Sequence, residues 1–273
     1  MVTIKKSKVR VAAFERVVWN VFFQAKNRGI SLVRHFPWIS NGDDLVYYMV
    51  VEIDGQIIGG LAVREWVGGS INSHKVKIGL IGLVCITPIF RGQGIANKLV
   101  NATLKQAAVD GFDALTLWTG KPDLYIQHGF VKADIWTYGW VRQIQIRIRR
   151  TVSLDCSAKL VERPSFSLPP FALSTHELIG AQSSVFLIKD SAGWIVTGYI
   201  GDVNEAASSM GANLSENWRV NLERDDLLRD ELIELGYHLD LKPVNLQMWF
   251  CINLNYHVAQ LVEKVRIPIL ERI

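Results

Sequence analysis

The segment PIFRGQGIANKLV, residues 88–100, decides the fold. An arginine precedes two glycines, Gly92 and Gly94, and an apolar pattern at helical spacing begins at once. Directly before it, residues 77–86 form an apolar run typical of a buried strand. A helix N-terminus carries unpaired backbone N–H groups and a partial positive charge. A buried strand that enters a helix through a glycine-rich turn therefore predicts a binding site for an anion.

The residue types in this turn favour a pyrophosphate as the anion. We expect Arg91 to add positive charge, and Gly92 and Gly94 to leave room for the ligand to reach the backbone donors. An ordinary tight strand-to-helix turn is the alternative. Neither packing nor turn geometry alone requires an arginine together with both glycines.

The flanking sequence predicts a layered α/β domain over residues 1–150. In chain order, the expected elements are a helix at 9–25, a loop or brief helix at 35–40, strands at 46–53, 56–66 and 75–86, a helix at 92–109, a strand at 113–119, a short helix at 123–128 and an extended stretch to 150. Asp54-Gly55 is the hairpin turn between the first two strands. This order indicates a mixed central sheet flanked by helices.

The second half of the chain resembles the first. Residues 151–184 hold Ser, Thr and three prolines, which indicates a connection. Residues 185–273 are then predicted to form a smaller α/β domain, interpreted as a shortened repeat without a pyrophosphate loop. The turn at Gly55 is echoed at Gly193, and HGFV at 128–131 is echoed by LGYH at 235–238. Two unrelated hairpins that both use glycine are the alternative.

These motifs resemble the GCN5-related N-acetyltransferase (GNAT) superfamily. The loop RGQGIA fits the family's R/Q-x-x-G-x-G/A signature, with matches at Arg91, Gly94 and Ala96. The segment LYIQHGF, residues 124–130, resembles the second landmark, a tyrosine shortly before Gly-Phe. The resemblance covers residues 9–145. It implies a GNAT-like fold and an acyl-CoA-dependent N-acyltransferase, with acetyl-CoA or another acyl-CoA as cosubstrate and no metal.

The resemblance also assigns an acyl-CoA site. The residues expected around the pyrophosphate are Arg91, Gly92, Gln93, Gly94, Ile95 and Ala96. Backbone groups of Val84, Cys85 and Ile86 would receive the pantetheine arm, beside a partner strand at 115–119 that splays away. Thr119 could supply a side-chain contact where the family often has Asn. The N–H of Ile86 is the expected oxyanion donor.

Two glycines in the same strand have open interpretations. Gly79 and Gly82 weaken the strand locally. They mark a bulge or make room for an acyl group larger than acetyl, or else they are tolerated for packing.

Tyr125 is the candidate catalytic side chain. Acyl transfer leaves a coenzyme A thiolate, which a phenol at hydrogen-bond distance could protonate or stabilise. The alternative is that Tyr125 only packs below the Gly-Phe turn. The general base stays open among a water relay and four side chains, namely Glu52, Glu65, His35 and His74.

Composition favours an anionic, flat acceptor. The formal net charge is +4, the pI is about 8.9 and the chain has nine tryptophans. The aromatic residues expected near the acceptor are Phe36, Trp38, Tyr47, Trp66, Trp136, Tyr138 and Trp140. Core packing is the alternative explanation for about half of them. We expect the amine of a nucleotide-linked amino sugar. An aminoglycoside, a polyamine and a protein amine are alternatives, as is a non-catalytic CoA-binding regulator.

Composition also limits the class of protein. With 49% hydrophobic and 21% charged residues, the chain can bury a large core and is not disordered. Its three cysteines are far apart and indicate free thiols in a reducing compartment. Neither a signal peptide nor an apolar run near 18 residues is evident, so we expect a soluble, cytoplasmic protein. No nucleic acid or membrane partner is expected, and a homo-oligomer stays open.

Overall fold

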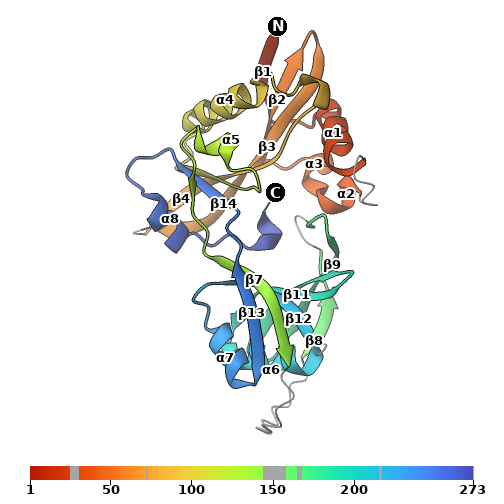
Figure 1. Cartoon of the computed structure of the whole chain (residues 1–273), viewed down its shortest axis with the longest axis vertical. Helices are drawn as coiled ribbons and strands as arrows, with labels where there is room; N and C mark the ends of the chain where they lie inside the picture. Colours follow the sequence, from red (N-terminus) through yellow and green to blue (C-terminus); the bar gives the residue numbers. More distant parts are fainter. Residues whose placement is uncertain (25–30, 72, 144–157, 165–167, 215–216, 273) are drawn as a thin grey trace. The chain divides into compact units, whose positions relative to one another are not determined.

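The computed structural model describes residues 1–24, 31–71, 73–143, 158–164, 168–214 and 217–272 (Figure 1). Its contacts divide the chain into two units. Unit 1 comprises Met1–Asp134, Asn245–Ile267 and Glu271–Ile273. Unit 2 comprises Ile135–Val244 and Pro268–Leu270. Each unit contains a seven-stranded mixed sheet flanked by helices, which confirms the predicted fold class.

The sheet of unit 1 has the order β1-β2-β3-β4-β5-β14-β6. Its strands are β1 (Val2–Ser7), β2 (Val46–Ile53), β3 (Gln56–Ile71), β4 (His74–Ile86), β5 (Ala114–Trp118), β14 (Gln247–Cys251) and β6 (Val131–Lys132). All neighbours pair antiparallel except β4 and β5, which are parallel and are joined through α4 (Ile95–Val109). A parallel pair needs such a crossover.

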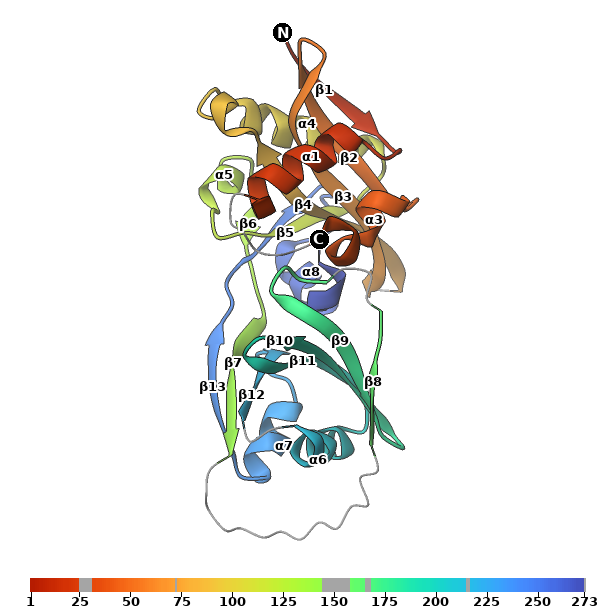
Figure 2. The ribbon, with the colours of Figure 1, turned by 90° about the vertical axis from the view of Figure 1, so that its right-hand side faces the viewer.

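Helices cover both faces of this sheet (Figure 2). Tyr47, Met49 and Val51 of β2 share a core with the buried face of α4. The alternate residue Tyr48 contacts Phe14 of α1 (Ala12–Val18), with ring centroids 5.9 Å apart. Because side chains alternate along a strand, a continuous apolar run such as VYYMVV is buried on both faces.

Short helices complete unit 1. They are a π-helical turn at Trp19–Phe23, α2 (Leu32–His35), α3 (Pro37–Asn41), a 3-10 helix at Pro88–Phe90, α5 (Asp123–Ile126) and α8 (Val258–Lys264). The predicted helix at 9–25 is thus observed from residue 12 to 23, and its last residue lies outside the described part. The segment 35–40, predicted as a loop or a brief helix, contributes to two short helices. No described helix has the length and apolarity needed to cross a membrane.

The sheet of unit 2 has the order β8-β9-β10-β11-β12-β7-β13. Its strands are β8 (Lys159–Glu162), β9 (Ala172–Ile179), β10 (Ser183–Asp190), β11 (Gly193–Gly201), β12 (Asn217–Glu223), β7 (Trp136–Gln143) and β13 (Tyr237–Pro243). Helices α6 (Val203–Asn213) and α7 (Leu228–Glu234) pack on one side of it (Figure 2).

The two sheets have the same topology. In unit 2 the β11–β12 pair is parallel and joined through α6, whereas the other neighbours pair antiparallel. In both sheets the sixth position is filled from the other half of the chain. Strand β14 lies between β5 and β6, and β7 lies between β12 and β13. The predicted repeat therefore has a structural counterpart, with one strand exchanged between the halves.

This exchange changes the domain boundaries. The predicted first domain, 1–150, contains β7, which belongs to unit 2, and the predicted second domain, 185–273, contains β14, which belongs to unit 1. The predicted connection at 151–184 also holds β8 and β9. Strand pairing over such long separations has no local signal, so the sequence pattern could not reveal it.

One of the two landmark pairings in the repeat is wrong. Gly193 turns β10 into β11, which are equivalent to β3 and β4, whereas Gly55 turns β2 into β3. The other pairing fits the topology. Gly129 and Gly236 each follow the helix after the fifth strand, with φ of +89° and +88°. Glycine hairpins look alike in sequence, so the turn at Gly55 is matched to a turn in unit 2 that lies one strand too late.

Candidate active site

The loop between β4 and α4 has the conformation that its glycines permit. Gly92 and Gly94 have φ of +77° and +71°, values that other L residues rarely adopt. A Cβ atom at either position would meet no heavy atom within 4 Å. Arg91, Gln93 and both glycines are exposed. The glycines are therefore needed for the backbone turn, and the space before the loop is open to a ligand.

The N-terminus of α4 offers free backbone donors. Its first hydrogen bond runs from Lys98 N to Gly94 O at 3.2 Å, so the N–H groups of Ile95, Ala96 and Asn97 have no acceptor within the helix. Gly94 provides no capping side chain. The side chain of Ile95 is buried in the core and that of Ala96 is partly buried, which anchors the first turn while its donors face the loop.

Arg91 has a role beyond its charge. Its Nε donates to Ile86 O at 2.9 Å, which ties the loop to the end of β4. Thr87, the next residue after Ile86, donates its N–H to Ile58 O of β3 at 2.8 Å. Successive residues of a strand direct their backbone groups to opposite sides, so Ile86 directs its own away from β3. With its carbonyl bonded to Arg91, the Ile86 N–H lies on the open edge of β4.

That edge is open because β4 and β5 separate. Their pairing covers residues 78–80 of β4 and 114–116 of β5. Of the predicted splayed segment 115–119, residues 115 and 116 are still paired, and only 117–119 lie beyond the pairing. Among the described residues, the backbone of Val84, Cys85 and Ile86 then has no neighbouring strand on this side, as a ligand that inserts between the strands requires.

The bulge interpretation is confirmed beside Gly82, although the sequence analysis did not name Leu83, whose backbone forms the bulge. Leu83 has φ of +53°, and the register with β3 shifts between Gly82 and Cys85. Its one sequence signal is the adjacent Gly82. Gly79 serves packing instead, because a Cβ there would lie 2.4 Å from Cδ2 of Leu115. Bulges commonly redirect backbone groups beside active sites.

Cys85 is not a nucleophile at this site. Burial raises the pKa of its thiol to about 12, although the nearby Arg91 lowers it. The thiol is therefore protonated at neutral pH and behaves as a small apolar side chain. Cys85 and Cys251 are both free thiols, and Cys156 lies outside the described residues.

Tyr125 lies in α5 with 5% of its surface exposed. Its ring packs edge-on against Phe130, with centroids 5.7 Å apart. Burial raises the pKa of the phenol to about 12, so it remains protonated and can donate a hydrogen bond. Packing below the Gly-Phe turn and donation to a thiolate are thus compatible roles for the same side chain.

Side-chain hydrogen bonds connect α4, which follows the glycine loop, to the residues directly after α5, the helix that contains Tyr125. Asn97 of α4 and Gln127 exchange two amide bonds of 3.3 and 3.1 Å. One turn along, Asn101 contacts Nδ1 of His128 at 2.9 Å. The sequence analysis missed this connection, although the i, i+4 spacing of the two asparagines is visible in the sequence. It fixes α5, and with it Tyr125, against α4.

Thr119 is already engaged near the end of β5. Its hydroxyl oxygen accepts from Lys121 N at 2.9 Å, and its N–H donates to Leu246 O at 2.9 Å. The hydroxyl hydrogen can still be donated to a ligand.

The structure separates the four candidates for the general base. His74 begins β4, roughly 40 Å of extended strand from Ile86, and is too distant to act. Glu65 pairs in register with Gly79 and forms a 3.1 Å ion pair with Lys77. His35 is buried, with Nδ1 3.0 Å from Ser31 O. Only Glu52, ion-paired to Lys5 at 2.8 Å, lies near the Ile86 end of the sheet.

Most of the aromatic residues expected at the acceptor are core residues. Four have exposed fractions of 7% or less, which are Phe36, Trp38, Tyr47 and Trp136. Their rings are not available for stacking, so this expectation is wrong for them. Trp66 is half-buried in β3. Tyr138 and Trp140 lie on β7 in unit 2, where Trp140 contacts the guanidinium of Arg219.

Comparisons with known proteins agree with this geometry. The model of the acetyltransferase (GNAT) family matches residues 12–131. An uncharacterized N-acetyltransferase of Archaeoglobus fulgidus is 32% identical over 113 residues, which are 41% of this chain and 74% of that protein. The chain belongs to the GNAT family. Its class is therefore that of acyl-CoA-dependent N-acyltransferases, and the family uses acetyl-CoA as cosubstrate.

A second GNAT relative is an uncharacterized N-acetyltransferase of Methanocaldococcus jannaschii. It is 26% identical over 117 residues, which are 41% of this chain and 50% of that protein, so the match spans about half the length of this relative. Solved structures show the same fold over both units. A GCN5-related N-acetyltransferase of Kribbella flavida has a TM-score of 0.62 with 13% identity, covering 92% of this chain and 72% of its own. A probable N-acyltransferase of Enterococcus faecalis has a TM-score of 0.63 with 12% identity, covering 93% and 74%.

Proposed function

We propose that this GNAT protein transfers an acyl group from acyl-CoA to a primary amine in unit 1. The observation that carries the proposal is the open strand-to-helix loop with free N–H groups at residues 95–97. Pyrophosphate oxygens would accept from these donors, and Arg91 would add charge beside them. The pantetheine arm would extend along the unpaired edge of β4 at residues 84–86.

Transfer then follows from the groups at the end of β4. A neutral amine attacks the thioester carbonyl, and the tetrahedral oxyanion accepts a hydrogen bond from the N–H of Ile86. Carbon–sulfur bond cleavage releases the thiolate, and the amine loses its proton to water or to Glu52. Holding amine and thioester together supplies much of the rate.

The phenol of Tyr125 would stabilise the leaving thiolate. An ordinary thiol has a pKa of roughly 8.5, below the value of about 12 for Tyr125. Complete proton transfer from Tyr125 to the thiolate is therefore unfavourable. Donation of a hydrogen bond, with the final proton coming from solvent, fits these values better.

We propose the amine of a nucleotide-linked amino sugar as the acceptor. The support is the net charge of +4, which attracts a diphosphate better than a polycation. Among the expected aromatics of unit 1, the indole of Trp66 is half-buried and keeps exposed surface. An aminoglycoside, a polyamine and a protein amine are the competing acceptors.

Release of free thiol from acetyl-CoA, and separately from a longer acyl-CoA, tests both the transferase activity and the identity of the acceptor. Amino sugars with and without the nucleotide, an aminoglycoside, a polyamine and a lysine peptide serve as acceptors. Turnover with any amine supports the transferase. Preference for the nucleotide-linked sugar supports the acceptor, and equal rates with the free sugar contradict it. Tight acyl-CoA binding without turnover on any amine would indicate a regulator instead.

A further inference from the structure

A polar cavity of about 160 Å³ lies in unit 1 at the C-terminal end of α4. Lys6 and Lys8 approach it from β1 and its following turn, Lys77 from β4, and Asp110 caps the helix. The ring of Phe112 completes one side. The cavity thus brings together five segments of the sequence, around residues 6–8, 44–47, 65, 77 and 110–112.

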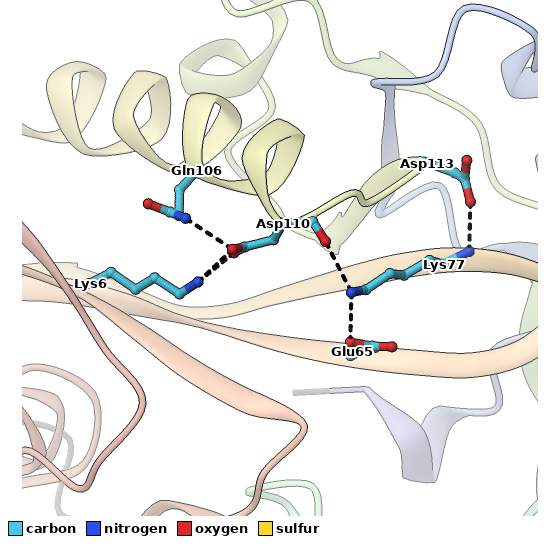
Figure 3. Close-up of polar contacts among 6 residues, drawn as sticks. All are labelled: Lys6, Glu65, Lys77, Gln106, Asp110 and Asp113. Carbon is cyan, nitrogen blue, oxygen red and sulfur yellow. Dashed lines mark hydrogen bonds and ion pairs between the residues drawn. The ribbon is translucent and has the colours of Figure 1, made fainter.

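A network of hydrogen bonds holds the inner charged groups of the cavity (Figure 3). Lys6 Nζ donates to both carboxylate oxygens of Asp110, at 2.6 and 2.7 Å. Lys77 Nζ donates to the Asp110 carbonyl at 3.1 Å and lies 3.1 Å from a carboxylate oxygen of Glu65. Gln106 also donates to Asp110. These charges are balanced and fixed in place, so they form a rigid floor.

Tyr47 contributes a buried aromatic side chain to this floor. It is 5% exposed, and its hydroxyl has no hydrogen-bond partner among the described residues. Lys6 Nζ lies 4.7 Å from its ring centroid. Burial, and then the charge of Asp110, raise the pKa of this phenol above its ordinary value, so the hydroxyl is protonated. The hydroxyl is itself buried from solvent, so Tyr47 lines the cavity as an aromatic side chain and does not offer its hydroxyl to a ligand.

The rim carries one charge of each sign. Lys8 and Asp44 both line the cavity and are exposed, and neither forms an ion pair within the described part of the chain. The Nζ of Lys77 donates to the Asp110 carbonyl, forms an ion pair with Glu65 and lies 4.6 Å from the centroid of the Phe112 ring, and its ammonium has three hydrogens. The available groups are therefore cationic donors on one hand and a carboxylate on the other.

We propose that this cavity binds a small zwitterion, a free α-amino acid. Its carboxylate would accept from Lys8 and Lys77, and its ammonium would donate to Asp44. With three lysines and three acidic residues in its lining, the cavity has no net charge, which suits a ligand that is also neutral overall. A simple anion would leave Asp44 unpaired beside it.

The cavity is distinct from the proposed acyl-CoA site. Helix α4 has 15 residues, and its N-terminus carries the loop while Asp110 caps its other end. A helix of this length is roughly 22 Å long, so the amino acid would not meet the thioester. The two sites share α4 as a rigid connection, and the binding proposal does not depend on the transferase activity.

Calorimetric titration of the full chain tests the proposal. Glycine, L-alanine and L-serine are titrated in turn, with propionate and ethylamine as analogues that keep one charge each. We expect at least one amino acid to bind and both analogues to bind at least tenfold more weakly, because each lacks a charge-assisted hydrogen bond. Propionate binding as tightly as alanine would make this an anion site, and no binding by any amino acid at 10 mM, on the order of the weakest useful affinities, would also overturn the proposal.

Variants locate the binding. Lys8→Ala and Asp44→Asn change exposed side chains, so folding should be unaffected, and each should weaken amino-acid binding about tenfold. Lys105→Ala, which changes an exposed lysine on the outer face of α4, is the matched control and should bind normally. Tyr47→Phe removes only the buried hydroxyl and should also bind normally. Wild-type affinity in both rim variants would contradict the assignment.

Discussion

The two units begin their crossover helices in opposite ways. Before α4 the chain inserts residues 87–94, and Gly94 leaves the helix N-terminus uncapped. Before α6 only Asp202 separates the helix from β11, and its carboxylate accepts from Glu205 N at 2.8 Å. Two sheets of the same topology thus present one N-terminus open to an anion and one already occupied by a carboxylate.

A second carboxylate strengthens this difference in unit 2. Glu205 accepts from the N–H groups of Ala181 and Gln182 at 2.8 and 2.7 Å. Partial desolvation opposes the shift, but these backbone donors hold the pKa of Glu205 below its ordinary value. The crossover helix is a common scaffold. Binding of an anion depends on whether its first N–H groups are left free.

The largest effect is expected from giving unit 1 the cap of unit 2. Gly94→Asp should reduce acyl-CoA affinity at least about 100-fold, because a carboxylate at the helix N-terminus repels the pyrophosphate. Gly94→Asn is the matched control, since both residues tolerate a positive φ and have the same shape. Calorimetry measures both, and the wild type should bind one acyl-CoA per chain.

Two equivalent acyl-CoA sites per chain would mean that unit 2 binds the cosubstrate as well as unit 1 does, which would contradict the difference between the two helix N-termini. Equal affinities of the aspartate and asparagine variants would show that charge at the N-terminus does not decide binding.

Tyr125→Phe should lower kcat about 100-fold while acyl-CoA affinity stays near that of the wild type. The hydroxyl matters mainly when charge develops on sulfur, whereas the ring packing against Phe130 is retained. Pre-steady-state measurement of acyl transfer, combined with equilibrium binding, separates the two quantities. Unchanged transfer with chemistry rate-limiting would leave Tyr125 a packing residue.

Asp202→Ala should destabilise the protein by about 1 kcal/mol through loss of the α6 cap. It should leave acyl-CoA binding unchanged, since the donor groups of unit 2 are not used by the cosubstrate. Urea unfolding measures the first quantity and calorimetry the second. Asp202→Asn, which retains a capping oxygen, is the control. Gain of a second acyl-CoA site in Asp202→Ala would contradict the assignment of unit 2.

The smallest effect is expected at the connection between α4 and α5. Asn97→Ala and Gln127→Ala should each lower kcat about threefold, because an exposed amide pair contributes roughly 0.5–1 kcal/mol. The double variant should lose no more than either single variant, since both remove the same interaction. Multiplicative losses would mean that the two residues act independently of each other.

The sequence predicts the loop and misses the tertiary arrangement, for physical reasons. Arg91, Gly92 and Gly94 act through local backbone geometry, which a short motif determines. The roles of Trp38 and Tyr47 depend on which side of a strand or helix is covered, so composition alone placed them wrongly at an acceptor. Leu83 adopts a positive φ that no propensity would suggest, since its conformation is imposed by the register of β3 and β4.

The exchanged strands determine when each sheet can be completed during synthesis. Unit 1 requires β14, whose Trp249 is fully buried, and β14 emerges from the ribosome on the order of 10 s after β6. Until then one edge of β5 has no partner and is able to pair with another chain. A fragment that ends before residue 247 would stay in that condition permanently. The nascent chain is thus most exposed to aggregation while unit 2 is being made.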